Sequence, residues 1–286
     1  MLNRNKWLDY LLNIDRRVVY VIIFLSIALP FFLNPVVDIQ PTKWVSAVYN
    51  EMEEAARTNK PIIIGFDYDP SSLAELDPMA KVLLRHAFSK NIKVLGLNFI
   101  ANGTSLADIT MEQVAKEFGK EYGKDYVYLG YLPQYDLVLL NFGDNFRKSF
   151  SKEFRGQPIE NIPMLSNIQN YDDFHMVIDL SGTKLPTAYI MYGVTRYHFK
   201  FVTGCTAVSA TEYYPYLQSG QMVGLITGMK GAAEYEGLVK SNLNIPTGDA
   251  MRGMASQTWG HLVIIIFIII GNILYFVRKK ITVESK

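Results

Sequence analysis

Two aspartates, Asp67 and Asp69, follow directly after the apolar run 61–66 (PIIIGF). Such a run predicts a strand buried on both faces, and parallel sheets bind ligands beyond the carboxyl ends of their strands. Paired carboxylates at that place can hold a divalent metal, or act as a nucleophile and an acid. The structural interpretation is a turn, because Asp readily forms Asx-turns and Asp-Pro begins them.

The segment DYDPS, which contains both aspartates, resembles the opening DxDx(T/S) motif of haloacid dehalogenase-type phosphotransferases. This resemblance covers one short segment and implies that Asp67 is the nucleophile and Asp69 the acid/base. Ser181 would then stand for the second motif of that family, and Lys184 for its basic residue. The chain departs from the pattern because no acidic pair follows a later predicted strand, which leaves the magnesium site incomplete.

Cys205, the only cysteine in the chain, lies directly beyond another predicted strand, 199–204. A cysteine nucleophile needs an adjacent base that polarises the thiol. The segment around Cys205 looks like the nucleophile segment of caspase-like and clostripain-like peptidases, whose dyad histidine follows the preceding core strand. Gly182 and Thr183 occupy that place in this chain. The usual state of a single cysteine is a buried structural thiol.

Motifs for cofactors and metals are missing from the sequence. No GxGxxG follows a predicted strand and no GxxxxGK(S/T) occurs, so we expect no nucleotide cofactor. The histidines show no HxxxH spacing, and we therefore expect no metal site. We expect His86 to lie on a solvated helix face. The residues with which the strand ends could bind a small ligand are Asp67, Asp69, Asn102 and Ser181.

Two apolar runs, 18–37 and 259–277, bracket the chain. Each is about long enough to cross a hydrocarbon core of roughly 30 Å as a helix. The first run is interrupted by Pro30, but it is too long for a cleaved signal peptide and has no small-x-small site after it. Basic residues precede the first run and follow the second, and they include Arg16, Arg17, Arg278, Lys279 and Lys280. Both termini are therefore expected to be cytoplasmic.

These runs divide the chain into five parts. They are a cytoplasmic amphipathic segment (1–17), a first transmembrane helix (18–37), an extracytoplasmic domain (38–258), a second transmembrane helix (259–277) and a cytoplasmic basic tail (278–286). The formal net charge of +1 gives no electrostatic reason to expect nucleic acid as a partner. A single cysteine excludes an internal disulfide, so the domain must be stabilised by its core.

The middle domain alternates apolar runs with helical patterns. The predicted strands are 61–66, 92–99, 136–142, 174–180 and 199–204, although 125–142 could be either a strand pair or one strand with its lead-in. Asp77 with Pro78 predicts the start of one helix, and Thr110 with Gln113 forms a capping box for another. The alternation predicts an α/β fold with a doubly wound, mostly parallel, Rossmann-like sheet.

Gly220, Gly224 and Gly228 recur every four residues. On a helix they would form a smooth stripe that another backbone can approach closely. Each glycine costs a helix about 1 kcal/mol relative to alanine, so three on one face suggest a packing requirement. The stripe would pack either on the domain itself or on another subunit. Asn272, inside the second span, would likewise seek a partner on the first span or on another subunit.

With no complete catalytic constellation, the sequence predicts a scaffold or accessory subunit of a membrane assembly that senses a small ligand. The expected partners are the lipid bilayer and either further copies of the chain or other membrane-protein subunits. The alternative is a membrane-tethered hydrolase that uses Asp67 and Asp69 with a divalent metal, or Cys205 as the nucleophile. The fold class does not decide between them, because this architecture hosts many functions.

Overall fold

Six parallel strands form one sheet in the computed structural model, which describes residues 14–33, 39–245 and 248–284. The strand order is β3-β2-β1-β4-β5-β6. The strands are β1 (Ile62–Asp67), β2 (Val94–Asn98), β3 (Tyr126–Tyr131), β4 (Val177–Ser181), β5 (Phe201–Cys205) and β6 (Gly224–Thr227). This is a doubly wound order, in which successive strands are added outward in one direction from β1 and in the other direction from β4.

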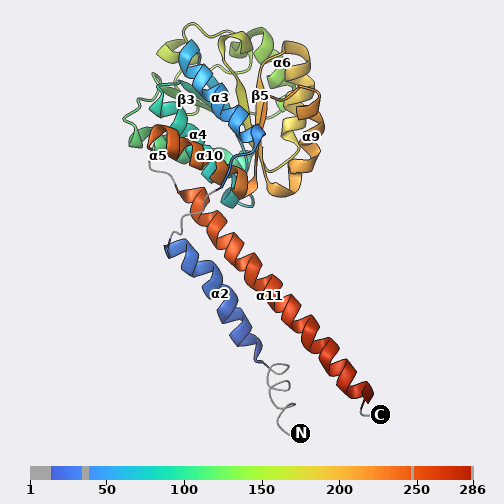
Figure 1. Cartoon of the computed structure of the whole chain (residues 1–286). Helices are drawn as coiled ribbons and strands as arrows, with labels where there is room; N and C mark the ends of the chain where they lie inside the picture. The colour runs from blue at the N-terminus through green and yellow to red at the C-terminus, as the bar shows by residue number, and fades with distance from the viewer. Residues whose placement is uncertain (1–13, 34–38, 246–247, 285–286) are drawn as a thin grey trace. The chain divides into compact units, whose positions relative to one another are not determined.

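Helices cover both faces of the sheet (Figure 1). One face carries α3 (Lys43–Thr58), α4 (Leu73–Ser89), α5 (Thr104–Glu117) and α10 (Gly228–Leu243). The other carries α6 (Tyr135–Asn145), α7 (Leu185–Ala188), the π-helix η6 (Tyr189–Val194), α8 (Thr195–Tyr197) and α9 (Ala210–Gln218). Short 3₁₀ turns lie between them: η1 (Ala101–Gly103), η2 (Phe146–Lys148), η3 (Ile159–Asn161), η4 (Pro163–Leu165), η5 (Tyr171–Asp173) and η7 (Ala207–Ser209).

Four of the predicted strands are confirmed as β1, β2, β4 and β5. The predicted strand 136–142 is wrong, because these residues belong to helix α6 and β3 precedes it. Val138, Leu139 and Phe142 are buried in α6 at helical spacing, while the residues before them are exposed. A short apolar run is compatible with either a buried strand or a buried helix segment, and its periodicity alone does not distinguish them.

The predicted glycine stripe is also wrong, since its three residues do not share a helix. Gly220 follows α9 in a turn at φ +77°, Gly224 begins β6, and Gly228 begins α10 at φ +54°. A Cβ at Gly224 would overlap the Val48 side chain and lie 3.1 Å from the Trp44 carbonyl oxygen. The small size of Gly224 therefore lets α3 pack on β6 inside the domain. The expectation of a subunit interface at these glycines loses its structural basis.

Both predicted helix starts are displaced. Helix α4 begins at Leu73, with Pro78 inside it, and α5 begins at Thr104. Thr110 is therefore an interior residue rather than a cap, and its hydroxyl donates to Asp77 Oδ1 at 2.8 Å. Pro78 is the sixth residue of α4, beyond the first four N–H groups, so it removes the hydrogen bond that an N–H at this position would donate to the Ala74 carbonyl.

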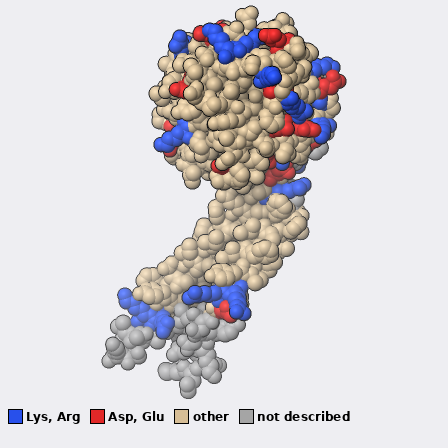
Figure 2. Space-filling view, turned by 180° about the vertical axis from the view of Figure 1, so that it is seen from behind, with Lys and Arg blue, Asp and Glu red and all other residues tan. Residues whose placement is uncertain are grey.

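Helices α2 (Arg16–Leu33) and α11 (Asp249–Glu284) belong to a separate unit, and by length and composition both could cross a membrane. The end of the predicted first span lies outside the described residues, as does most of the predicted amphipathic segment. Helix α11 contains the whole second span and begins well before it. Figure 2 shows a long stretch of these helices without acidic or basic residues.

Contacts between α2 and α11 occur at a different glycine from the one inside the predicted second span. A Cβ at Gly260 would lie 2.9 Å from Ile27 Cγ1, whereas one at Gly271 would meet no described atom within 4 Å. Asn272 donates its amide to the Ile268 carbonyl at 2.8 Å. The Asn272 amide therefore has a hydrogen-bond partner within its own helix, as polar side chains inside helices often do.

We expect Gly224→Ala to lower the free energy of unfolding of the domain by about 1–3 kcal/mol, because the added methyl group overpacks the contact between α3 and β6. Gly220→Asn is the matched control, since a side chain there meets open space and Asn tolerates positive φ. Urea unfolding of the full chain in detergent measures both. Equal midpoints for Gly224→Ala and the wild type would show that this contact is loose.

Candidate functional site: a buried carboxyl pair

Asp67 and Asp179 lie on β1 and β4, the two neighbouring strands between which the sheet reverses its direction of growth. The strand register pairs Gly65 with Asp179, and Asp67 with Ser181. Partners in a parallel register project to the same face of the sheet, which here is the face covered by η6. Both carboxyl groups are fully buried. The sequence prediction named Asp67 but missed Asp179.

Tyr189 brings a third oxygen to the pair from the π-helix η6. Its hydroxyl lies 3.4 Å from Asp67 Oδ2 and donates to it. A Cβ at Gly65 would lie 2.8 Å from Tyr189 Oη, 3.1 Å from Asp179 Oδ1 and 3.2 Å from Asp67 Oδ2. The three oxygens therefore converge on the space that a side chain at Gly65 would need. Short π-helical segments are frequent at functional sites.

The two carboxyl groups differ in their hydrogen bonds. Asp67 Oδ1 accepts the Phe99 backbone N–H at 2.5 Å, whereas neither oxygen of Asp179 has a hydrogen-bond partner among the described residues. A buried carboxylate without donors is costly, so its protonated form is favoured. Burial raises the pKa of Asp67 to about 6. Burial, together with the charge of nearby Asp67, raises the pKa of Asp179 well above its ordinary value.

The pair therefore titrates as a unit in which Asp179 keeps its proton and Asp67 carries the negative charge near neutral pH. Such a pair can accept and donate a single proton. Both groups are fully buried in this structure, so a substrate in solution cannot reach that proton.

Asp69 does not join Asp67 in a catalytic pair. Its Oδ1 accepts the Ser71 backbone N–H at 2.9 Å and the Ser71 hydroxyl at 2.6 Å. These hydrogen bonds lower the pKa of Asp69, and they form the Asx-turn of the structural interpretation. While Asp67 is fully buried, Asp69 is partly exposed in the loop after β1.

The other predicted ligand-binding residues are also dispersed. Ser181 is buried, and its hydroxyl is engaged with the Thr183 hydroxyl at 3.0 Å and backbone N–H at 3.1 Å. Asn102 is exposed on η1, and Lys184 forms a long ion pair with Glu212 at 3.8 Å. These residues therefore lie along the carboxyl edge of the sheet, but their side chains do not meet at one point.

Cys205 is the last residue of β5 and is fully buried. Burial raises the pKa of its thiol to about 12, so the thiolate that a nucleophile requires is scarce at neutral pH. His175 precedes β4 and hydrogen-bonds to Glu51 at 2.9 Å. It therefore lies at the amino edge of the sheet, whereas Cys205 ends its strand at the carboxyl edge.

The prediction that His86 is solvated is wrong. It is fully buried, with Nδ1 2.7 Å from Tyr235 Oη and Nε2 3.0 Å from Glu53 Oε1. Its ring also stacks on Tyr49, with 4.7 Å between ring centroids. Burial lowers the pKa of His86 to about 4. The signal that could have placed it inside is its helical spacing from the buried residues Met79, Val82 and Leu83.

Comparison of the chain with protein-family models, with curated proteins and with solved structures found no match. Among the described residues, no group of three or more His, Cys, Asp or Glu side chains is arranged to hold a metal ion. Function must therefore be argued from the geometry of this chain alone.

The raised pKa of Asp67 predicts a specific pH dependence of stability. The folded domain binds this proton more tightly than the unfolded chain, so the stabilising contribution is complete below about pH 4 and is lost as pH rises through about 6. Asp67→Asn removes this titration. The stability of the variant relative to the wild type should therefore rise between pH 4 and 6 and then level off.

Urea midpoints of both proteins measured from pH 4 to 8 test this expectation. The lowered pKa of His86 acts in the opposite direction over a similar range, but it is common to both proteins and cancels in the difference. A difference that does not change with pH would show that Asp67 titrates normally.

We expect Cys205 to resist alkylation by iodoacetamide at pH 8 in the folded chain and to react fully in urea, because its thiol is both buried and protonated. Val208→Cys provides the matched control, since Val208 is 86% exposed just beyond the same strand. Mass spectrometry of that variant should find one label under native conditions. Rapid native labelling of Cys205 itself would restore it as a candidate nucleophile.

Proposed function

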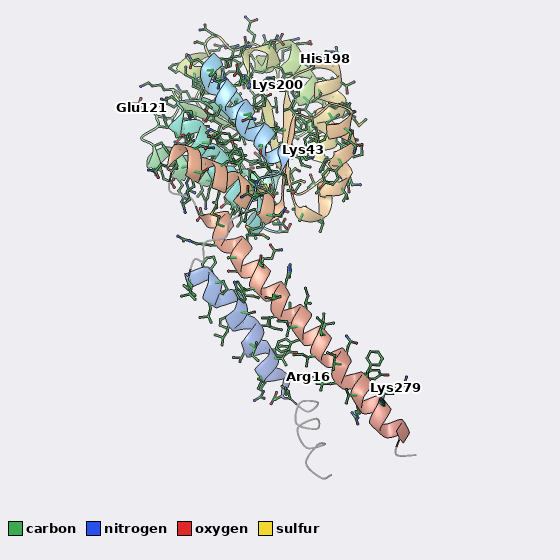
Figure 3. The ribbon with its side chains drawn as sticks, in the orientation of Figure 1. Arg16, Lys43, Glu121, His198, Lys200 and Lys279 are labelled. Carbon is green, nitrogen blue, oxygen red and sulfur yellow. The ribbon has the colours of Figure 1, made fainter. Side chains whose placement is uncertain are left out.

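We propose that this chain is an integral membrane protein whose extracytoplasmic α/β domain serves as a scaffold or accessory subunit of a membrane assembly. The apolar composition of α2 and α11 supports membrane insertion. Arg16 and Lys279 lie at the same end of the two helices in Figure 3. With Arg17, Arg278 and Lys280 beside them, this end favours the cytoplasmic side for both termini.

Residues near both ends of the domain are hydrogen-bonded to one helix. The Thr42 backbone N–H donates to Glu234 Oε2 at 2.9 Å, and the Ala250 backbone N–H donates to Glu236 Oε1 at 3.1 Å. Both glutamates belong to α10 and are buried. Charge-assisted hydrogen bonds of this kind are among the stronger ones in proteins. They support a compact α/β domain whose two ends are held at the same helix.

The observation that carries the scaffold proposal is a set of exposed apolar side chains on neighbouring elements, here named the α6–η6 surface. Tyr135 and Leu137 of α6 are 42% and 50% exposed, and Met191 of η6 is 61% exposed. Helix α6 and η6 pack against each other, and Tyr131 at the end of β3 is also exposed. Exposed apolar patches of this kind mark protein interfaces, and tyrosine and methionine are enriched there.

The hydrolase alternative receives no comparable support. Asp67 and Cys205 are both fully buried, and Asp69 is occupied by Ser71. Asp67 and Cys205 would each need a rearrangement of the domain before they could reach a substrate.

The proposal is tested by the mass of the complex extracted in mild detergent from its native membrane, with identification of the proteins that copurify. The wild type should form a discrete assembly, homomeric or with other subunits. Leu137→Asp combined with Met191→Asp should reduce its mass, because two charges would be buried in the interface. Ile109→Asp is the control, since Ile109 is 60% exposed on α5, which covers the other face of the sheet.

A wild-type chain that is monomeric in this experiment would overturn the proposal. If Ile109→Asp dissociated the assembly while the double variant left it intact, the interface would lie on the opposite face of the domain.

A further inference from the structure

An open cleft of about 430 Å³ lies at the amino edge of the sheet. It is formed where β5 begins, where the chain enters β6, and where α8 and α9 end. Its size falls within the range of small-molecule sites. This edge is opposite to the strand ends on which Asp67, Ser181 and Cys205 lie, so the cleft is separate from the buried carboxyl pair.

The inner wall of the cleft is apolar and partly aromatic, whereas its rim is polar. Val194, Phe199 and Val223 contribute to the wall. Thr195, His198, Lys200, Ser219 and Gln221 contribute hydroxyl, imidazole, ammonium and amide groups. An apolar pocket with a few convergent polar groups is the usual composition of a site for a small organic molecule.

Lys200 contributes an ammonium group to this rim, and an ion pair with Glu51 of α3 holds that group in place. Its ammonium donates to Glu51 Oε2 at 2.7 Å, and the same oxygen lies 2.9 Å from His175 Nε2. Burial alone would raise the pKa of Glu51, but the hydrogen bonds from Lys200 and His175 outweigh it and the pKa is lowered. Glu51 therefore stays ionised and holds the Lys200 ammonium group in place. An ammonium group has three donors, and the bond to Glu51 uses one of them.

His198 lies beside Lys200 at the same end of the domain (Figure 3). Its side chain is exposed and forms no hydrogen bond or ion pair with any described residue. Its backbone occupies the left-handed region at φ +56°, which is uncommon outside glycine and disfavours most side chains. Asn and His are both among the non-glycine residues that adopt this region most readily, so Asn can replace His198 without added backbone strain.

The charges around the cleft determine which class of ligand it favours. None of the described residues that line the cleft is acidic, and the nearby carboxylate, Glu51, is paired with Lys200 and His175. Lys200 and the amide and hydroxyl groups of the rim can all donate hydrogen bonds to an anion. Phe199 offers an aromatic surface next to them.

We propose that this cleft binds a small organic anion, a carboxylate carried on a planar apolar body. The carboxylate would accept hydrogen bonds from Lys200 and His198 at the rim, and the body would lie against Val194, Phe199 and Val223. Of these residues only Val194 belongs to η6, and the exposed side chains that define the α6–η6 surface are not among them, so this site is separate from the assembly role proposed above.

The test is binding of 4-(trifluoromethyl)benzoate to the full chain in lipid nanodiscs, followed by the ¹⁹F line width of the probe. Empty nanodiscs correct for partitioning into lipid, and 4-(trifluoromethyl)benzyl alcohol serves as the uncharged probe of nearly the same shape. The benzoate should bind and the alcohol should bind more weakly, because only the carboxylate makes charge-assisted hydrogen bonds.

Two variants localise the binding. Lys200→Gln should weaken benzoate binding by about tenfold or more, the usual effect of losing a hydrogen bond to a charged group. His198→Asn should weaken it while leaving thermal stability unchanged or higher, so a loss of binding is not a loss of folding. Lys184→Gln, which removes a charge at the carboxyl edge from a side chain that is 82% exposed, should leave binding unchanged.

Absence of benzoate binding above that of empty nanodiscs would overturn the proposal, as would equal binding of the two probes. Binding that both His198→Asn and Lys200→Gln leave intact would place the ligand elsewhere and would equally overturn it. None of these results bears on the assembly mass, so the two proposals can fail separately.

Discussion

Burial of a parallel sheet on both faces is the constraint from which the other features of this domain follow. Parallel strands need crossover connections, and these connections cover the sheet with helices on either side. Any polar group on a central strand is then removed from water. Asp67 and Asp179 are in this position, and they are accommodated by the proton that Asp179 keeps, one backbone N–H that Asp67 accepts and the space left by Gly65. His86 meets the same constraint between helices through Tyr235 and Glu53.

Much of the fold could be predicted because burial on both faces produces uniformly apolar strands. The runs that became β1, β2, β4 and β5 were recognisable for this reason, and the two long apolar helices by their length. The run 136–142 was mistaken because Val138, Leu139 and Phe142 are equally apolar in a helix that rests on the sheet. Strand β6 was missed because it has only four residues and begins with a glycine.

The candidate site was harder to predict than the fold. Asp179 was overlooked because an acidic residue within an apolar strand is ordinarily placed at a surface, and only the strand register reveals that it shares a face with Asp67. The amino-edge cleft had no sequence signal, since His198 and Lys200 flank a strand start and the ligands of such sheets are expected at the opposite edge. Its lining comes from segments brought together only by folding.

The two glutamates of α10 have a mechanical consequence. Residues two positions apart on an α-helix are rotated by about 200° around its axis. The side chains of Glu234 and Glu236 therefore leave α10 in nearly opposite directions, one to the Thr42 N–H and the other to the Ala250 N–H. A lateral force that separates the two chain ends would pull across the diameter of α10. Part of the load would also pass to α4, because Arg85 of that helix forms an ion pair with Asp249 at 3.2 Å, so two helices on the same face of the sheet would share it.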